Sequence, residues 1–232
     1  MPAQRKLIIA IDGPAGSGKS TVGKKVAEHL GYIYVDTGAM YRAAAWKALQ
    51  KKIPLDDAAA IARLVRETSM RLTCDYRQFQ ITIDGADVTQ AIRAPEVSEA
   101  SSRISTIAAV RQELVAQQQR LGEQGGVVME GRDIGTVVFP NADVKVFLDA
   151  TPEARGERRY AEDVRNGKPG RREVTIEAVR GRDRRDASRQ ASPMAPAKDS
   201  IYLDTTCLTV DQVVERILSL ATAAQNPSIA KS

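Results

Sequence analysis

Short apolar runs rich in β-branched residues recur along the chain, and longer stretches with helical periodicity separate them. Five of these runs predict strands, at residues 6–12, 32–36, 127–132, 144–150 and 200–205. Alternation of short strands and helices is typical of a parallel sheet with helices on its faces. The pattern therefore predicts one α/β domain over residues 1–232, built on a five-stranded parallel sheet.

Two helix starts have recognisable capping signals. Thr151 precedes Pro152, which predicts an N-cap with proline at the first helical position. Thr209 is followed three residues later by Gln212, and this spacing predicts a capping box at the start of the last helix.

One region departs from the alternation. Residues 70–76 and 79–85 predict two short strands around a turn at 77–78, and a third short strand is predicted near 87–89. Helices are predicted before this region, at 56–68, and after it, at 95–105 and 107–124. We therefore expect a small antiparallel insert, over about residues 56–105, on the α/β core.

Composition excludes several classes of protein. With 43% hydrophobic and 27% charged residues the chain is globular rather than disordered or fibrous. The apolar run at residues 7–11 is far too short for a membrane span or a signal peptide. Cys74 and Cys207 form no CxxC pair and His29 is the only histidine, which excludes a histidine-rich metal site and a Ser-His-Asp triad. We expect a protein of the reducing cytoplasm, with no membrane partner.

The positive charge is concentrated in one segment. The net charge is +5, and residues 155–189 account for all of it, with eleven Arg and one Lys against seven acidic residues. Guanidinium groups are always charged and match the planar geometry of carboxylate or phosphate. This segment therefore predicts an anionic ligand, either a nucleic acid or a small phosphate.

A phosphate-binding loop follows the first predicted strand and opens a helix. Its sequence is GPAGSGKS, comprising Gly13, Pro14, Ala15, Gly16, Ser17, Gly18, Lys19 and Ser20, with Thr21 next in the helix. Glycines let backbone N–H groups surround a phosphate, and the helix N-terminus adds a positive field. Lys19 is expected to reach the β- and γ-phosphates, and Ser20 to ligate Mg²⁺.

Features that the sequence lacks argue against two classes of protein that bind a nucleoside triphosphate. No asparagine begins the Asn-Lys-x-Asp motif that reads guanine, which argues against a GTPase switch. Aromatics are 4% of the chain and Tyr160 is the only one in the Arg-rich segment, which argues against a nucleic-acid-dependent ATPase. A small-molecule kinase remains. If its acceptor is itself a phosphate, it needs no histidine base, because alignment and charge neutralisation suffice.

Candidate acceptor-binding residues follow the other strands. Arg42 lies about one turn inside the helix after the second strand, and Arg132 and Asp133 follow the third. Ligands bind at the carboxyl ends of strands in open α/β sheets, so these side chains should converge on the phosphate loop. Farther on, Arg182, Asp186 and Arg189 are spaced i, i+4 and i+7, which predicts one helix face carrying all three.

Together these segments resemble a known family. The motifs GPAGSGKST, DTGAMYR, EGRDIGTVVFP, FLDA and RDRRDASR are similar to those of bacterial cytidylate kinases, a group of nucleoside monophosphate kinases. The resemblance runs from about Leu7 to the last helix. It implies a P-loop NTPase-type fold in which residues 56–105 form a monophosphate-binding subdomain. It also implies that residues 155–172 form a short lid over ATP, with Arg158 and Arg159 as donor contacts.

The resemblance also implies roles on the acceptor side. With Lys19, the arginines Arg42, Arg132 and Arg189 would form the catalytic clamp on the acceptor phosphate. Thr37 stands where some relatives have serine and keeps the hydroxyl group.

The nucleoside would be read by a second set of residues. Asp133, Arg111 and Ser102 would read cytosine, whose amino group donates to a carboxylate while N3 and O2 accept from a guanidinium. Arg182 and Asp186 would contact the ribose.

The implied activity is a phosphotransferase reaction with a phosphate group as acceptor. A Mg²⁺- and ATP-dependent enzyme would move the γ-phosphoryl group directly, in line, to CMP or dCMP, giving CDP or dCDP and ADP. We expect a monomer without nucleic-acid partners. Two alternatives stay open: a kinase for another small acceptor, such as UMP, AMP or a non-nucleotide, and a basic nucleic-acid-binding ATPase.

A few other residues are predicted to be structural. Cys74 and Cys207 are expected to be small buried or half-buried residues. His29 is expected at the end of the first helix without a chemical task. Met40, Trp46 and Leu49 have helical spacing and are expected to pack in the interior.

Overall fold

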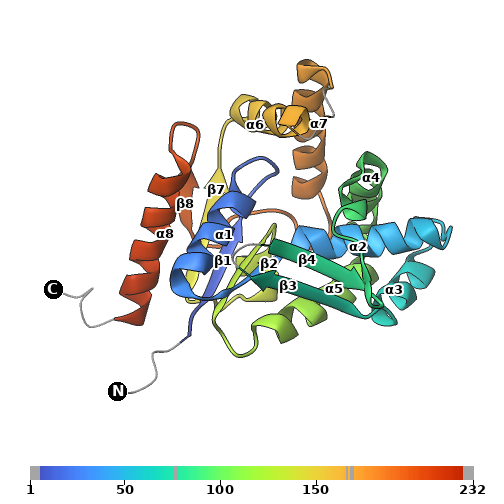
Figure 1. Ribbon diagram of the computed structural model, residues 1–232, viewed down its shortest axis with the longest axis horizontal. Coiled ribbons are helices and arrows are strands. Elements are labelled where there is room, and N and C mark those ends of the chain that lie inside the picture. The colour runs from blue at the N-terminus through green and yellow to red at the C-terminus, as the bar shows by residue number, and fades with distance from the viewer. Residues whose placement is uncertain (1–5, 76–77, 166, 168–169, 227–232) are drawn as a thin grey trace.

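A five-stranded sheet forms the centre of the molecule in the computed structural model, which describes residues 6–75, 78–165, 167 and 170–226 (Figure 1). Its strands are β1 (Ile8–Asp12), β2 (Ile33–Asp36), β6 (Val127–Gly131), β7 (Val144–Asp149) and β8 (Ile201–Asp204). They run in the order β2-β6-β1-β7-β8, and every neighbouring pair is parallel. The predicted α/β fold with a five-stranded parallel sheet is thus confirmed.

Helices cover both faces of this sheet. They are α1 (Lys19–Leu30), α2 (Thr37–Gln50), α3 (Ala58–Arg66), α4 (Pro95–Ile104), α5 (Ala108–Gly122), α6 (Pro152–Arg165), α7 (Arg172–Ala187) and α8 (Val210–Gln225), with a 3-10 turn at Ala91–Arg93 and a π-helical turn at Ile134–Val138. The predicted capping box at Thr209 is present, and Thr151 Oγ1 accepts a hydrogen bond from the Ala154 N–H at 3.3 Å. Within the described residues, none of the helices combines the length and apolarity that a membrane crossing requires.

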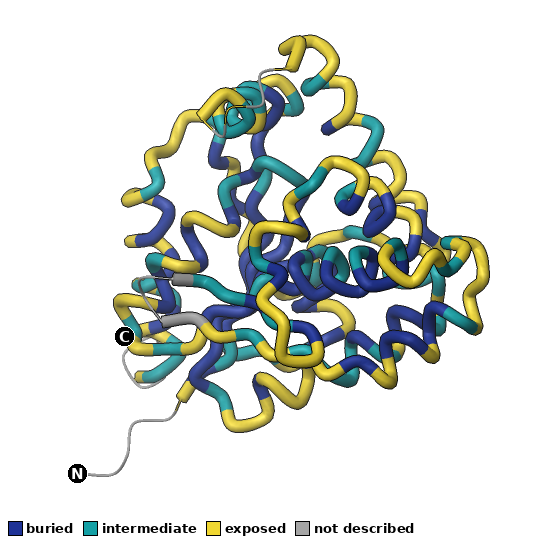
Figure 2. The backbone as a smooth tube through the Cα atoms, turned by 45° about the vertical axis from the view of Figure 1, so that its right-hand side comes forward, coloured by how far each residue is buried: buried dark blue, intermediate teal, exposed yellow. Residues whose placement is uncertain are grey.

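Successive side chains along each strand point to opposite faces of the sheet, and they form two separate hydrophobic cores. Ile9 and Ile11 on β1 pack with α1 and α8 on one face, whereas Ala10 on β1 and Met129 on β6 pack with α2 and α5 on the other. Strands buried on both sides are expected to be apolar throughout. β1 is apolar except for its last residue, Asp12, and β6 is apolar except for Glu130 near its end. Figure 2 shows the buried residues along the centre of the molecule, while much of the upper α6–α7 hairpin is exposed. The polar ends of these strands therefore mark where the site is built.

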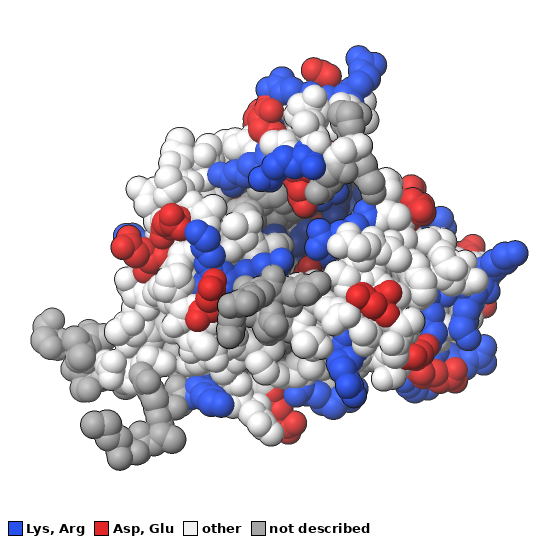
Figure 3. Space-filling model, in the orientation of Figure 1, with Lys and Arg blue, Asp and Glu red and all other residues white. Residues whose placement is uncertain are grey.

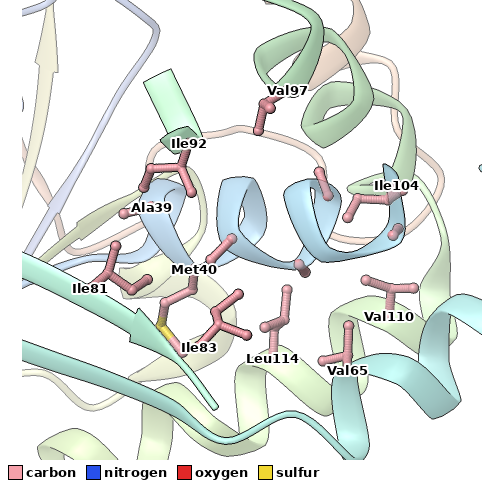
Figure 4. Close-up of a cluster of buried hydrophobic side chains, with 14 of the residues drawn as sticks. Ala39, Met40, Val65, Ile81, Ile83, Ile92, Val97, Ile104, Val110 and Leu114 are labelled. Atoms are coloured by element: carbon pink, nitrogen blue, oxygen red, sulfur yellow. The ribbon is translucent and has the colours of Figure 1, made fainter. Parts of the chain in front are cut away.

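The antiparallel insert is a three-stranded sheet packed on α2. Its strands are β3 (Met70–Asp75), β4 (Gln78–Ile83) and β5 (Ala86–Asp87), so the third strand lies slightly earlier than predicted, and the predicted turn at 77–78 lies partly outside the described residues. Ile81 and Ile83 face Met40 of α2 (Figure 4). The Lys47 ammonium lies 2.7 Å from Asp84 Oδ2 and from Thr68 Oγ1. These contacts fix the insert to the helix that also carries Arg42.

The prediction for Cys207 is wrong. This residue is exposed, in the loop after β8, because that loop leaves the sheet and its neighbour Leu208 is also exposed. The side chain of Cys74 lies outside the described residues. His29 is in the last turn of α1 and exposed, as expected, and Met40 packs in the larger core with Trp46 and Leu49 against it.

Candidate active site

The phosphate-binding loop lies between β1 and α1, and two of its glycines have no room for a side chain. Gly13 has a φ of +142°, and a Cβ there would lie 1.9 Å from the Leu148 carbonyl oxygen of β7. Gly16 has a φ of +78°, and its Cβ would lie 2.7 Å from the Arg155 carbonyl oxygen of α6. Only glycine tolerates both constraints. The loop is therefore pressed directly against β7 and α6.

Lys19 is buried at the start of α1. Its Nζ donates to the Pro14 carbonyl at 2.6 Å and lies 3.4 Å from Ser17 Oγ, so the ammonium is held over the loop. Burial and the nearby Arg132 lower the pKa of Lys19 to about 7. An anion bound in the loop would stabilise the charged form. Ser20 and Thr21 follow on the exposed side of the helix.

A buried carboxyl group stands beside the loop at the end of β6. Glu130 accepts hydrogen bonds from the hydroxyl groups of Tyr34 and Ser20. Burial and the Asp36 carboxylate raise the pKa of Glu130. Thr37 Oγ1 donates to the Glu130 backbone carbonyl at 2.7 Å. The oxygens of Ser20, Glu130 and Asp36 are of the hard type that Mg²⁺ prefers.

The candidate clamp arginines all contact acidic residues or their backbone. Arg42 lies 2.9 Å from Asp36, and Arg132 lies 2.8 Å from Asp186 on α7. Arg182 lies 3.9 Å from the same Asp186 carboxylate. Burial and Arg132 lower the pKa of Arg182 to about 10. The structure thus brings Arg42, Arg132 and Arg182 together near Asp36 and Asp186, so these three arginines outnumber the two carboxylates that they contact, which favours an anion.

Arg189 is not on the predicted helix face. Helix α7 ends at Ala187, with Ser188 as its C-cap, so the i, i+7 relation to Arg182 is lost. The Arg189 side chain nevertheless turns back, and its Nε donates to the Asp186 carbonyl at 3.2 Å. It is 8% exposed, so it stays in the same buried group although the helix that was expected to carry it has ended.

The residues predicted to read the base form a second buried cluster. Arg111 of α5 makes an ion pair with Asp133, and its Nη1 donates to the Ser105 carbonyl at 3.3 Å. Its guanidinium also lies 5.6 Å from the centre of the Tyr41 ring. Ser102 Oγ accepts from Arg185 Nε at 3.2 Å. The structure thus brings Arg111 and Asp133 into contact and leaves Ser102 bonded to α7.

Several buried polar atoms of the described residues make no hydrogen bond here. Among the described residues, Tyr41 Oη, Arg111 Nε, Arg182 Nε and Arg189 Nη2 are buried and make no hydrogen bond. Buried polar atoms in native proteins are almost always paired, so a group of unpaired ones indicates a place that a polar ligand fills. Figure 3 shows Lys and Arg side chains gathered around a hollow below the α6–α7 hairpin. We take this hollow as the candidate active site.

The predicted lid arginines lie on α6, and two of them already have partners. Arg158 donates to Thr205 Oγ1 at 3.0 Å and to the Thr205 carbonyl at 2.6 Å. Arg159 is exposed and lies 3.3 Å from both Glu162 and Asp163. The predicted lid turn lies largely outside the described residues, at 166, 168 and 169.

Four residues of this site were not predicted from the sequence. Glu130 ends an apolar strand inside a quoted motif, and Tyr41 directly precedes Arg42, so both positions carried a usable signal. Asp12 is the charged last residue of an otherwise apolar strand, a position that Asp also occupies in β2, β7 and β8. Arg155 carried no signal, because it lies among many arginines and only its burial sets it apart.

Asp12 connects β1 to the segment that carries Asp133. Its carboxylate accepts from the backbone N–H of Ile134 at 2.8 Å and of Gly135 at 2.7 Å. Burial raises the pKa of Asp12 from 3.8 to about 6, although both hydrogen bonds oppose the shift. The folded protein therefore holds this proton more tightly than the unfolded chain does.

This gives a pH-dependent prediction for stability. Between pH 4 and 6 the unfolded chain ionises Asp12 while the fold keeps it protonated, so the stability contributed by this group is lost as pH rises. The variant Asp12→Asn does not titrate. We expect the free energy of unfolding of the wild type, relative to this variant, to fall by about 2 to 3 kcal/mol from pH 4 to pH 7. Urea unfolding at four pH values measures it, and a constant difference would contradict it.

Comparisons with known proteins agree with this geometry. The sequence model described as cytidylate kinase matches residues 9–223. The chain belongs to the cytidylate kinase family. It is 49% identical to the cytidylate kinase of Bacillus licheniformis, over 94% of this chain and 96% of that one. It is 48% identical to the cytidylate kinase of Bacillus subtilis, over 93% and 96%.

A solved structure supports the fold of this cytidylate kinase family member. A gluconokinase from Sinorhizobium meliloti aligns over 99% of both chains with a TM-score of 0.50 and 18% sequence identity. At this identity the likeness concerns the fold alone. The predicted P-loop kinase architecture is therefore confirmed.

Proposed function

We propose that this protein is a cytidylate kinase that transfers the γ-phosphoryl group of ATP to CMP or dCMP, giving CDP or dCDP and ADP. The observation that carries the proposal is the buried Arg111–Asp133 pair beside the phosphate loop, in a chain of the cytidylate kinase family. Cytosine offers an amino donor next to two acceptors, and this pair offers a carboxylate next to a guanidinium. Uracil presents a donor at position 3 and an acceptor at position 4, so it would leave Asp133 without its donor.

Arginines would hold the acceptor phosphate in line with the donor. Arg132 interacts electrostatically with both Lys19 and Arg189, and Arg42 interacts with Arg182, which supports placing Arg42, Arg132 and Arg189 around one acceptor phosphate. Hydrogen bonds between charged groups are typically worth about 1.5 to 3 kcal/mol each. The acceptor phosphate oxygen is already an anion, so the reaction needs no general base. These side chains would orient both phosphates and neutralise the charge that spreads over the transferred group.

The nucleoside would contact the adjacent helix. Arg182 and Asp186 on α7 are proposed to bind the ribose hydroxyls, with Asp186 as the acceptor. Tyr41 lies beside the Arg111 guanidinium, and Tyr41 and Ser102 are proposed as further contacts to the base.

The site has oxygen ligands suited to Mg²⁺. Ser20 is proposed to bind the ion directly or through water, with Glu130 beside it at the end of β6. When bound with ATP, Mg²⁺ would supply charge neutralisation at the β- and γ-phosphates. The chain's own residues would position this complex, since the Ser20 hydroxyl is held by Glu130 at the first turn of α1.

Two segments would serve the two substrates. We include residues 56–105 in the proposal as the monophosphate-binding subdomain and residues 155–172 as the lid. Arg158 and Arg159 are proposed to contact ATP after exchanging their present partners, because closing over a triphosphate excludes water and strengthens such contacts.

A coupled ADP-release assay over CMP, dCMP, UMP and AMP tests this function. We expect CMP or dCMP to give the highest kcat/KM by at least about 10²-fold, because a buried mismatched hydrogen-bonding group is strongly discriminated against. Equal rates with CMP and AMP would refute the cytosine assignment. Salt-dependent binding of DNA or RNA with no active acceptor would instead favour a nucleic-acid-binding ATPase.

A further inference from the structure

Arg155 joins three segments of the chain through one buried side chain. It lies in the first turn of α6 and is 4% exposed. Its Nε donates to the Ala150 carbonyl at 2.9 Å, at the end of β7, and its Nη1 donates to the Ala15 carbonyl of the phosphate loop at 3.1 Å. Nη1 also donates to Asp183 of α7. A buried guanidinium is costly unless it is paired in this way, so these contacts fix the three segments together.

Asp183 places this contact on the helix that reads the acceptor. It directly follows Arg182 and precedes Asp186 by three residues, and Asp186 is paired with Arg132. Two carboxylates of helix α7, Asp183 and Asp186, therefore hold it near the site. Asp186 holds it to the end of β6, and Asp183 holds it, through Arg155, to the phosphate loop on the β7 side.

The contact with the phosphate loop is close and specific. Besides the hydrogen bond to Ala15, the backbone of Arg155 fills the space where a side chain at Gly16 would lie. The other oxygen of Asp183, Oδ1, is buried and has no hydrogen-bond partner among the described residues. The ion pair with Arg155 is thus the main interaction that offsets the free-energy cost of burying the Asp183 carboxylate.

A second ion pair joins the same helices without touching the site. Arg180 of α7 pairs with Glu153 of α6, and both side chains are largely exposed. This pair contacts neither the phosphate loop nor Arg182 or Asp186. It therefore separates the effect of fastening α6 to α7 from the effect of fastening α7 to the loop.

We propose that Arg155 and Asp183 are positioning residues that hold the acceptor-binding helix in register with the phosphate loop. The inference rests on the proposed function, because it concerns the alignment of the two phosphates. Neither residue needs to touch a reacting atom. Phosphoryl transfer is sensitive to such alignment, since a misplacement of about 1 Å can cost on the order of 10²-fold in rate.

Three variants test the proposal. Asp183→Asn keeps the shape but removes the charge, Arg155→Lys keeps the charge but cannot reach all three partners, and Glu153→Gln removes the control pair. We expect kcat with CMP to fall by about 10- to 100-fold in the first two, with KM values within a few-fold of wild type. The Glu153→Gln variant should keep wild-type kcat. The double variant that combines Arg155→Lys with Asp183→Asn should lose much less kcat than the product of the two single losses, because the two residues act as one unit.

A binding measurement distinguishes misalignment from general damage. A bisubstrate analogue, with cytidine and adenosine joined through five phosphates, spans both sites and requires their register. In Asp183→Asn its affinity should fall about tenfold, while ADP and CMP each bind alone as in wild type. Unchanged kcat and analogue affinity in this isosteric variant would overturn the proposal, even if Arg155→Lys fails to fold. A wild type inactive with CMP would instead overturn the proposed function.

Discussion

Replacing Lys19 by methionine should lower kcat with CMP by about 10³-fold, the scale expected when one preorganised charged donor is removed from a transition state. The Lys19 ammonium is buried and donates to the Pro14 carbonyl of the phosphate loop. Methionine fills a similar volume and brings no buried charge, so the variant should unfold at the same temperature or higher. Steady-state kinetics with a thermal melt measures both.

Lys25 provides the matched control for this result. It lies on the same helix, but its side chain is 44% exposed and pairs with Asp211 away from the site. Lys25→Met should keep kcat within about twofold of wild type, because isolated surface ion pairs contribute little. A Lys19→Met enzyme that retains a tenth of the activity would show that this ammonium is not at the transferred phosphate.

Replacing Asp133 by asparagine should abolish the preference for cytosine. We expect kcat/KM for CMP to fall by about 10²- to 10⁴-fold, because the neutral amide loses the charge that pairs with Arg111 and its oxygen is a weaker acceptor for the cytosine amino group than a carboxylate. The same amide can donate to the carbonyl at position 4 of uracil, so activity with UMP should rise relative to CMP. The ratio of the two kcat/KM values is the quantity to measure.

Calorimetric titration with ADP separates base reading from structural damage. Asp133→Asn should bind ADP as wild type does, since Asp133 pairs with Arg111 and not with the phosphate loop. Glu113→Gln changes a carboxylate on the Arg111 helix that pairs with the exposed Arg66, and it should alter neither property. Equal losses of CMP activity and ADP affinity in Asp133→Asn would make Asp133 a structural residue.

Local patterns were sufficient to predict most elements of this fold. The five strands are found within two residues of their predicted ends, because each is a compact run of β-branched residues bounded by polar ones. The phosphate loop is readable for a similar reason, since its glycines, lysine and serine all lie within eight consecutive residues. The pairing order of the strands was not predicted, because it depends on contacts between segments distant in sequence.

Side-chain partners across the fold were harder to predict. Arg155 and Arg158 occur in one arginine-rich stretch, yet Arg155 is locked against the loop while Arg158 reaches Thr205. Arg189 was placed on a helix that in fact ends two residues earlier. Helical spacing predicts which residues share a face, but it does not tell where the last turn stops or which face meets another segment.

The arginines of the proposed site are in contact with carboxylates of the protein itself, and this has a consequence for turnover. Arg42 pairs with Asp36 and Arg132 with Asp186, so a phosphate that binds these arginines as proposed would displace or share an internal carboxylate. The net binding free energy of the phosphate would then be the difference between the arginine–phosphate and the arginine–carboxylate interactions. When the product dissociates, the guanidinium groups can re-form their ion pairs with the same carboxylates. If the proposed site is correct, the internal carboxylates would thereby weaken the binding of a highly charged product and speed its release.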